Sequence, residues 1–309
     1  MNTNTMQGVT KRSADTNDVG LVEHPLPSAR PGHVVLEVAA AGICGTDLHI
    51  YRNEYASNPP VILGHEVCGR VSELGAGVDA ALSGRRVVCE TFFSTCGQCR
   101  YCREGRPNMC GSRKSIGSHV NGAMARFVEI PARNLHVVSD HLSDAEASLA
   151  EPVACVANSL FGEVSYVEPG DRVLVTGPGT IGLLAAQVAR IAGGNVTVRG
   201  TQDDAVRLAM AKTLGFEIST VGDDLVEACF DNLMNMGLSG RNSNLSLDPI
   251  CMKELSITSG FASTPRSWRR AMGWLQSGSM MLAPLITDVL PLSAWNQGFD
   301  RSFAADGIK

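Results

Sequence analysis

The sequence predicts an α/β protein in which a β-rich region precedes a parallel sheet. The first region consists of short apolar β segments separated by Gly and Pro, among them 33–39, 61–63, 67–73 and 86–89. From Asp171 onward, strand-like and helix-like segments alternate. Such alternation is typical of a parallel sheet built from βαβ units. We therefore expect two domains of different architecture.

The expected elements of the second half follow in order along the chain. A helix should begin at Ser143, because Ser143 is a favourable N-cap and Glu146 completes a capping box. The alternating part predicts strands at 172–176, 196–198 and 216–221 and helices at 180–192 and 203–214. A strand at 253–258 and a helix at 265–276 end the series. The stretch between 222 and 247 is rich in Asn, Met, Gly and Ser and contains no convincing β run.

Composition excludes several functional classes. Hydrophobic residues make up 44% and charged residues 18% of the 309 residues, values that are normal for a soluble globular protein. A net charge of −5 without a long Lys/Arg run argues against a nucleic-acid partner. No apolar stretch approaches the roughly 18–20 residues of a membrane span, which argues against a membrane partner. Residues 1–21 lack the apolar core of a secretory signal, so we expect a cytoplasmic protein with reduced thiols.

Four of the ten cysteines have the spacing of a metal site. Cys96, Cys99, Cys102 and Cys110 form C-x2-C-x2-C-x7-C. Four thiolates in one short loop suit a closed, tetrahedral structural zinc. A bacterial ferredoxin-type iron–sulfur cluster requires a shorter last gap followed by proline, and a disulfide pair is disfavoured in a reducing cytosol. The spacing therefore predicts structural zinc.

A second set of metal-ligand residue types is dispersed over three segments. Cys44 offers a thiolate, His65 an imidazole, and Glu66 and Glu151 offer carboxylates. A catalytic zinc takes three protein ligands and keeps one position open. Read singly, each residue also has a structural interpretation, since an isolated cysteine is usually a small buried apolar residue. Taken alone, these residues leave the two interpretations evenly balanced.

A glycine motif lies at the start of the alternating region. Gly177, Gly179 and Gly182 form G-x-G-x-x-G, with Pro178, Thr180 and Ile181 between them. The motif follows a predicted strand and opens a predicted helix, which is the context that dinucleotide binding requires. The glycines allow a tight turn and a close approach of a pyrophosphate to the helix N-terminus. The sequence therefore predicts a nicotinamide dinucleotide site here.

The choice between NAD and NADP depends on the end of the second strand. An acidic residue about 20 positions beyond the motif normally binds the ribose hydroxyls of NAD. Here residues 199–202, none of them acidic, stand at that position, and Asp203 comes after them. Arg199 could instead meet the 2′-phosphate of NADP, so the expectation leans toward NADP while NAD stays open.

Together these motifs resemble the zinc-dependent medium-chain alcohol and polyol dehydrogenases. Cys44–His49, Gly64–Glu66, the four-cysteine lobe and the glycine motif occur in the order and spacing of that family. The resemblance is closest to the sorbitol and threonine dehydrogenase branch, because Glu151 with Pro152 stands where simple alcohol dehydrogenases have a cysteine ligand. It implies an oxidoreductase that transfers a hydride between a small alcohol or polyol and NAD or NADP.

The resemblance also implies the architecture. We expect a β-rich, partly barrel-like (GroES-like) catalytic domain over 1–152 that binds zinc. A doubly wound Rossmann domain over 153–265 should bind the nucleotide, and 266–309 should return to the catalytic domain. Members of the family suggest a homodimer or a homotetramer.

Individual roles follow from the same resemblance. Cys44 and His65 would bind the catalytic zinc, and either Glu66 or Glu151 would supply the third ligand, with the other held through water or exchanging during turnover. Thr46 would accept the proton of the substrate hydroxyl, and His49 would pass it toward solvent. Arg207 corresponds to a family arginine near the adenosine ribose.

The nucleotide domain departs from the family pattern. A doubly wound sheet places its fourth strand beside its first, and one βαβ unit needs about 30 residues or more. The stretch 222–253 is too short for two such units, although Met234–Met236 could form a substitute strand. The first strand would then expose an apolar edge. The alternative is therefore a non-catalytic or deletion-derived zinc-binding relative that has lost cofactor-dependent activity.

Overall fold

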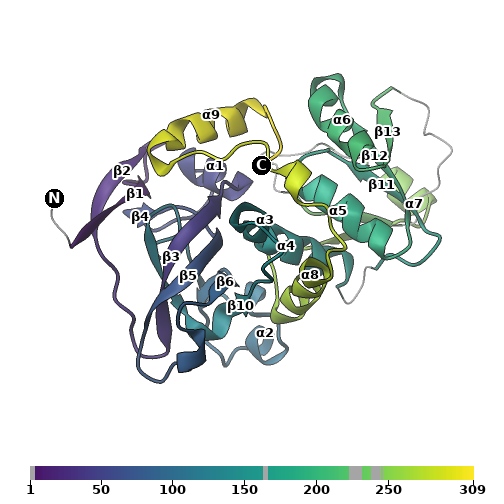
Figure 1. Cartoon of the computed structure of the whole chain (residues 1–309). Coiled ribbons are helices and arrows are strands. Elements are labelled where there is room, and N and C mark those ends of the chain that lie inside the picture. Colours follow the sequence, from purple (N-terminus) through teal and green to yellow (C-terminus); the bar gives the residue numbers. More distant parts are fainter. Residues whose placement is uncertain (1–3, 163–165, 223–231, 238–243, 245) are drawn as a thin grey trace. The chain divides into compact units, whose positions relative to one another are not determined.

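The computed structural model describes residues 4–162, 166–222, 232–237, 244 and 246–309 (Figure 1). The chain forms two compact units. The first unit comprises Met1–Glu151, Ile286–Gly307 and Lys309, and the second comprises Pro152–Leu285 and Ile308. The return to the first unit therefore begins at Ile286, later than residue 266, where the sequence places it. Helix α8 (Pro265–Ser277) belongs to the second unit, where the Arg270 guanidinium donates to Phe161 O at 2.7 Å.

The first unit is rich in β structure, as the sequence predicts. Its strands are β1 (Thr5–Lys11), β2 (Val19–Pro25), β3 (His33–Gly42), β4 (Val61–Ile62), β5 (Glu66–Leu74), β6 (Arg86–Cys89), β7 (Phe92–Ser94), β8 (Lys114–Ser115), β9 (Phe127–Pro131) and β10 (Leu135–Val137). Its helices are α1 (Gly45–Tyr51), α2 (Arg100–Arg103), α3 (Asp144–Ser148) and α9 (Trp295–Ala304). Strands β1 and β2 precede the first β segment that the sequence predicts.

The strands of the first unit form antiparallel sheets. The largest has the order β10-β6-β5-β3-β9, a smaller one has the order β2-β1-β4, and β7 pairs with β8. Residues Val34 and Leu36 on β3, like Val67 and Val71 on β5, are buried in one core, because alternate residues of a strand share a face. The shift of register between Val38 and Ala40 marks an irregularity in β3.

A second core lies beneath helix α9, which brings the C-terminal part of the chain back to the first unit. Phe299 of α9 is buried with Ile50 of α1. The ring of Tyr51 lies 5.8 Å from that of Phe299 and 5.2 Å from that of Phe303. These aromatic contacts hold α1, the helix that follows Cys44, against the rest of the unit.

Helix α3 begins as the capping signal predicts. Glu146 N donates to the Ser143 hydroxyl at 3.2 Å, and Ser143 N donates to the Glu146 carboxylate at 2.9 Å. The backbone amides of Ser143 and Glu146 at the helix start thus both have side-chain acceptors, which confirms the predicted capping box. Helix α4 (Ala150–Leu160) follows directly and carries Glu151 in its first turn.

The second unit contains the predicted parallel sheet. Strands β11 (Arg172–Thr176), β12 (Asn195–Gly200) and β13 (Glu217–Thr220) pair in parallel in the order β11-β12-β13. Helices α5 (Thr180–Ile191) and α6 (Ala205–Thr213) connect them (Figure 1). The alternation of strand and helix beyond Asp171 therefore gives the expected architecture.

The short stretch 222–253 contains one described strand, close to the position suggested for a substitute strand. Strand β14 (Asn232–Asn235) pairs in parallel with β15 (Ser256–Ser259), and α7 (Asp248–Met252) lies between them in the chain. The expectation of no convincing β run in 222–247 was wrong, although the substitute strand suggested at Met234–Met236 overlaps β14. Pairing with β15 stabilises four residues of weak intrinsic β preference. Residues 223–231 and 238–243 of this stretch lie outside the described part.

Strand β11 forms an edge of its sheet. Within the described residues its neighbour is β12 on one side, and the β14–β15 pair forms a separate sheet. The three apolar residues Val173–Val175 of β11 are half-buried. A doubly wound sheet would instead place a fourth strand beside β11. Among the described residues β11 is thus an edge strand, as expected from the sequence, but its apolar residues are half-buried and not fully exposed.

None of the helices in the described ranges has the length and apolar character needed to cross a membrane.

Candidate metal centres and nucleotide cradle

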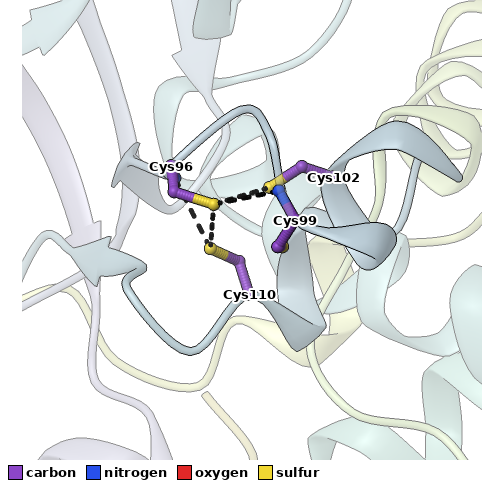
Figure 2. Close-up of side chains that lie close together, drawn as sticks. All are labelled: Cys96, Cys99, Cys102 and Cys110. Atoms are coloured by element: carbon purple, nitrogen blue, oxygen red, sulfur yellow. Dashed lines mark hydrogen bonds between the residues drawn. The ribbon is translucent and has the colours of Figure 1, made fainter.

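The four-cysteine lobe brings its sulfur atoms together, as Figure 2 shows. Cys96 follows β7, Cys99 caps α2, Cys102 lies within α2, and Cys110 ends the 3₁₀ turn Pro107–Met109. The four Sγ atoms lie within 4.8 Å of one another. Zinc–sulfur bonds of about 2.3 Å place the sulfurs of a tetrahedral site about 3.8 Å apart. The Sγ of Cys96 lies 3.6 Å from that of Cys110 and 4.0 Å from that of Cys102, so the lobe fits a zinc ion.

Hydrogen bonds and burial shift the pKa values of the thiols in this lobe. Hydrogen bonds from the amides of Gln98 and Cys99 lower the pKa of Cys96 to about 6. Burial, followed by hydrogen bonds to its neighbouring thiols, raises the pKa of Cys102 to about 11. The thiolate is the form of cysteine that binds metal, so Cys96 is prepared for coordination by local geometry alone.

A second cluster joins Cys44, at the N-cap of α1, to His65 and Glu66, where β5 begins. One ligand atom of each lies within 4.8 Å of the others. His65 and Glu66 are buried, and Cys44 is half-buried. A thiolate, an imidazole and a carboxylate at such separations match the donor set of a catalytic zinc. The structure thus brings together three of the four ligands predicted from sequence.

Glu151, the fourth predicted ligand, lies beside this cluster but outside its 4.8 Å limit. Its carboxylate accepts a hydrogen bond from the Thr91 hydroxyl at 3.1 Å. Burial by itself would lower the pKa of His65, but the thiolate of Cys44, Asp47 and more weakly Glu151 raise it well above its ordinary value. The surroundings of His65 are therefore suited to a positive charge.

Asp47 ties the two ligand-bearing segments together. Its side chain is fully buried, and its two oxygens accept hydrogen bonds from Cys44 N at 2.9 Å and Gly64 N at 3.1 Å. One of these oxygens also lies 3.8 Å from Nδ1 of His65. Sequence reasoning missed Asp47, although its place three residues after the N-cap Cys44 is the capping-box position.

Lys309 is a second residue that sequence reasoning missed. Its ammonium forms an ion pair with Glu66 Oε2 and donates to Ile43 O at 2.9 Å. Burial by itself would lower the pKa of Lys309, but the charges of Glu66 and Cys44 raise it above its usual value. Its separation from Glu66 by more than two hundred residues leaves no local signal of this contact.

The two predicted proton-transfer residues lie on α1. Thr46 is half-buried in the first turn, two residues after Cys44. His49 lies one turn further, and its Nδ1 is 2.7 Å from a carboxylate oxygen of Glu54. The Glu54 side chain is 39% exposed, so this contact lies near the surface.

The glycine motif has the expected strand–turn–helix geometry in the second unit. Gly177 follows β11 with φ of +92°, a conformation that favours glycine. A Cβ on Gly182 would lie 1.9 Å from Gly177 O, so helix and turn could not approach as they do. A Cβ on Gly179, the N-cap of α5, would meet no protein atom within 4 Å. Space therefore remains beside the N-terminus of α5, where Thr180 and Ile181 begin the helix.

The end of β12 presents both a carboxylate and arginines. Arg199 donates from its guanidinium to Thr220 O on β13 at 3.4 Å. Asp204 accepts hydrogen bonds from the amide and hydroxyl of Thr201, both at 2.9 Å. Arg207 lies 3.9 Å from the same carboxylate. An acidic group thus follows β12 closely in space, although it comes late in the sequence.

Comparison with known proteins agrees with these features. Residues 30–140 match the alcohol dehydrogenase GroES-like domain. The chain is 33% identical to a D-arabitol-phosphate dehydrogenase of Enterococcus avium, over 99% of this chain and 96% of the relative. It is 31% identical to a sorbitol dehydrogenase of Halalkalibacterium halodurans, over 98% of each.

A solved structure supports the same assignment. An alcohol dehydrogenase of Escherichia coli CFT073 in complex with NADH has a TM-score of 0.85 and 26% identity, over 97% of this chain and 96% of that one. The alignment with the Enterococcus relative runs over 341 positions, whereas this chain has 309 residues. At least 32 of those positions therefore have no counterpart here. The chain belongs to the zinc-dependent medium-chain dehydrogenases and is an oxidoreductase that uses NAD or NADP.

Proposed function

We propose that the first unit binds two zinc ions, one in each cluster. Cys96, Cys99, Cys102 and Cys110 would hold a structural ion, because four thiolates leave no position for substrate. Cys44, His65 and one carboxylate would hold the catalytic ion. The observation that carries this proposal is the 4.8 Å limit within which the ligand atoms of Cys44, His65 and Glu66 lie. It favours Glu66 as the third ligand and leaves Glu151 as the exchangeable carboxylate behind it.

The proposed reaction is hydride transfer between a small alcohol or polyol and NAD or NADP. Bound zinc would supply a Lewis acid that acidifies the substrate hydroxyl, and bound nicotinamide would accept the hydride. Thr46 would take up the hydroxyl proton as its own hydroxyl proton moves on toward His49, and Glu54 would receive a proton from His49 and release it to solvent. The 2.7 Å contact between His49 and Glu54 supports this direction of proton transfer.

The proposed nucleotide site is the turn that contains Gly177, Gly179 and Gly182. The pyrophosphate would lie against the N-terminus of α5, where Thr180 and Ile181 begin the helix, because free amides and the helix dipole favour an anion there. Arg207 would lie near the adenosine ribose. Asp204 would favour the ribose hydroxyls of NAD, whereas Arg199 and Arg207 would favour the 2′-phosphate of NADP, so both nucleotides need to be tested.

The substrate class follows from the relatives. Two of them act, by name, on arabitol phosphate and sorbitol, and both are polyols. We therefore expect a polyol, or a simpler secondary alcohol. We also propose a cytoplasmic location, which would keep the thiolates of both clusters reduced, and a homodimer or homotetramer, whose mass light scattering would measure.

The test is zinc-dependent turnover. Purified protein is loaded with zinc, its metal content is measured, and polyols and alcohols are supplied with NAD or NADP. Two zinc ions per chain and turnover that a chelator abolishes would support the proposal. Two zinc ions with neither turnover nor cofactor binding would favour the alternative, a non-catalytic relative. The edge strand β11 and the missing alignment positions are the observations in favour of that alternative.

A further inference from the structure

The ion pair between Lys309 and Glu66 is buried at the proposed catalytic centre. The Lys309 side chain is 8% exposed and that of Glu66 is 1% exposed. A buried ammonium is costly unless it is paired and hydrogen-bonded. Lys309 satisfies this requirement with the Glu66 carboxylate and with Ile43 O, the carbonyl directly before Cys44. One cation thus contacts the carboxylate of one predicted ligand and the backbone next to another.

The backbone around Lys309 is anchored independently of its side chain. Lys309 O accepts hydrogen bonds from the amide of Thr287 at 2.8 Å, from its hydroxyl at 2.9 Å and from the amide of Asp288 at 3.2 Å. These three bonds fix where the side chain starts. The position of the ammonium is therefore determined by the fold of the first unit.

Gly42 leaves the space that this pair needs. A Cβ at Gly42 would lie 2.1 Å from Glu66 Oε2 and 2.8 Å from Lys309 Cε. Any larger residue would push both groups away from the end of β3. The segments that carry Gly42, Glu66 and Lys309 thus come together around the Glu66 carboxylate and hold it in one arrangement.

One oxygen of Glu66, Oε2, is buried and forms the ion pair with the Lys309 ammonium. Glu66 nevertheless offers a ligand atom within 4.8 Å of those of Cys44 and His65. An oxygen that contacts an ammonium has part of its acceptor capacity engaged, so the other oxygen of the carboxylate is the freer one to bind a metal ion.

We propose that Lys309 is a positioning residue that restricts Glu66 to one oxygen toward the metal. This inference rests on the proposed zinc site at Cys44 and His65. By holding Oε2, the ammonium prevents bidentate binding and offsets one of the negative charges of the site. The coordination position that a second oxygen would fill stays available to substrate.

The test uses cobalt in place of zinc and compares four variants. In Lys309→Met, both oxygens of Glu66 become available, so the visible absorption of Co²⁺ should weaken and shift, as expected when an ion gains a ligand atom. Turnover should fall by about 10–100-fold, the usual effect of losing a group that orients a ligand. Lys309→Arg keeps the positive charge and should retain the wild-type spectrum.

The remaining variants show whether Lys309 acts through Glu66. In Glu66→Gln the carboxylate is absent, so adding Lys309→Met should leave the cobalt spectrum of Glu66→Gln unchanged. A wild-type spectrum in Lys309→Met, with only a lower melting temperature, would mean that the pair is structural and would overturn the inference. A wild-type protein without a Cys44-dependent cobalt signal would instead refute the metal site itself.

Discussion

The two units of this chain preserve unequal parts of the family architecture. In the first, each cluster is held from several sides: Asp47 joins the Cys44 and Gly64 segments, and the β7–β8 pair flanks the cysteine lobe. In the second, the glycine motif keeps its geometry, but β11 has a neighbour on one side only within the described residues. The comparison teaches that a metal site can be complete in a unit of its own, whereas a nucleotide cradle depends on a sheet that flanks it.

The largest effect is expected for Cys44→Ser. This change removes a ligand of the proposed catalytic zinc, so all turnover should be lost and the zinc content should fall from two ions per chain to one. The melting temperature should change little, because the structural ion remains. Activity assays and metal analysis check this, with Cys251→Ser, an exposed cysteine on α7, as the matched control. Retained turnover would refute the catalytic role of Cys44.

The next largest effect is expected for Cys102→Ser. A structural zinc site contributes folding free energy directly. A loss on the order of 3 kcal/mol would lower the melting temperature of the first unit by about 6–12 °C. Differential scanning calorimetry measures it, again against Cys251→Ser. An unchanged melting temperature would argue against a structural ion in the lobe.

Thermal unfolding with and without cofactor tests the second unit. At about 100 times its Kd, a cofactor stabilises the native state by about 2.7 kcal/mol. We expect two thermal transitions, and NAD or NADP should raise only the lower one, because β11 has a neighbouring strand on one side only within the described residues. The nucleotide that gives the larger shift identifies the coenzyme. No shift with either would mean that the shortened unit no longer binds it.

Two glycine variants are a matched pair for the same thermal-unfolding experiment. Gly179→Ala adds a methyl group that meets no protein atom, so the melting temperature without cofactor should stay unchanged while the cofactor-dependent rise is lost. Gly182→Ala adds a methyl group 1.9 Å from Gly177 O and should lower the melting temperature without cofactor as well. If cofactor raises the melting temperature of Gly179→Ala as much as that of the wild type, pyrophosphate does not bind at this turn.

The smallest of these effects is expected for Asp47→Asn. Asparagine keeps one acceptor oxygen but loses the other and the charge, so one of the bonds to Cys44 N and Gly64 N should weaken. Turnover and zinc affinity should each fall by about 10–100-fold. Metal titration and kinetics check this. Asp79→Asn, in an exposed cap, is the control and should have no effect on zinc.

Features that depend on local spacing were predictable from residue type and spacing alone. The four-cysteine lobe spans fifteen residues, and the glycine turn and the Ser143 capping box are shorter still. Short closed loops have few conformations, so residue type and spacing suffice to predict their contacts. That 222–253 is too short for two βαβ units is likewise a matter of chain length, since such a unit has a minimum size.

Tertiary structure alone decided which distant groups meet. That Glu66, rather than Glu151, lies within 4.8 Å of Cys44 and His65 follows from the register of β5 against β3. The contact of Lys309 with Glu66 and the pairing of β14 with β15 join segments that carry no mutual local signal. These choices depend on long-range packing, where the free energy gained by burial and pairing outweighs the local preferences that a sequence pattern expresses.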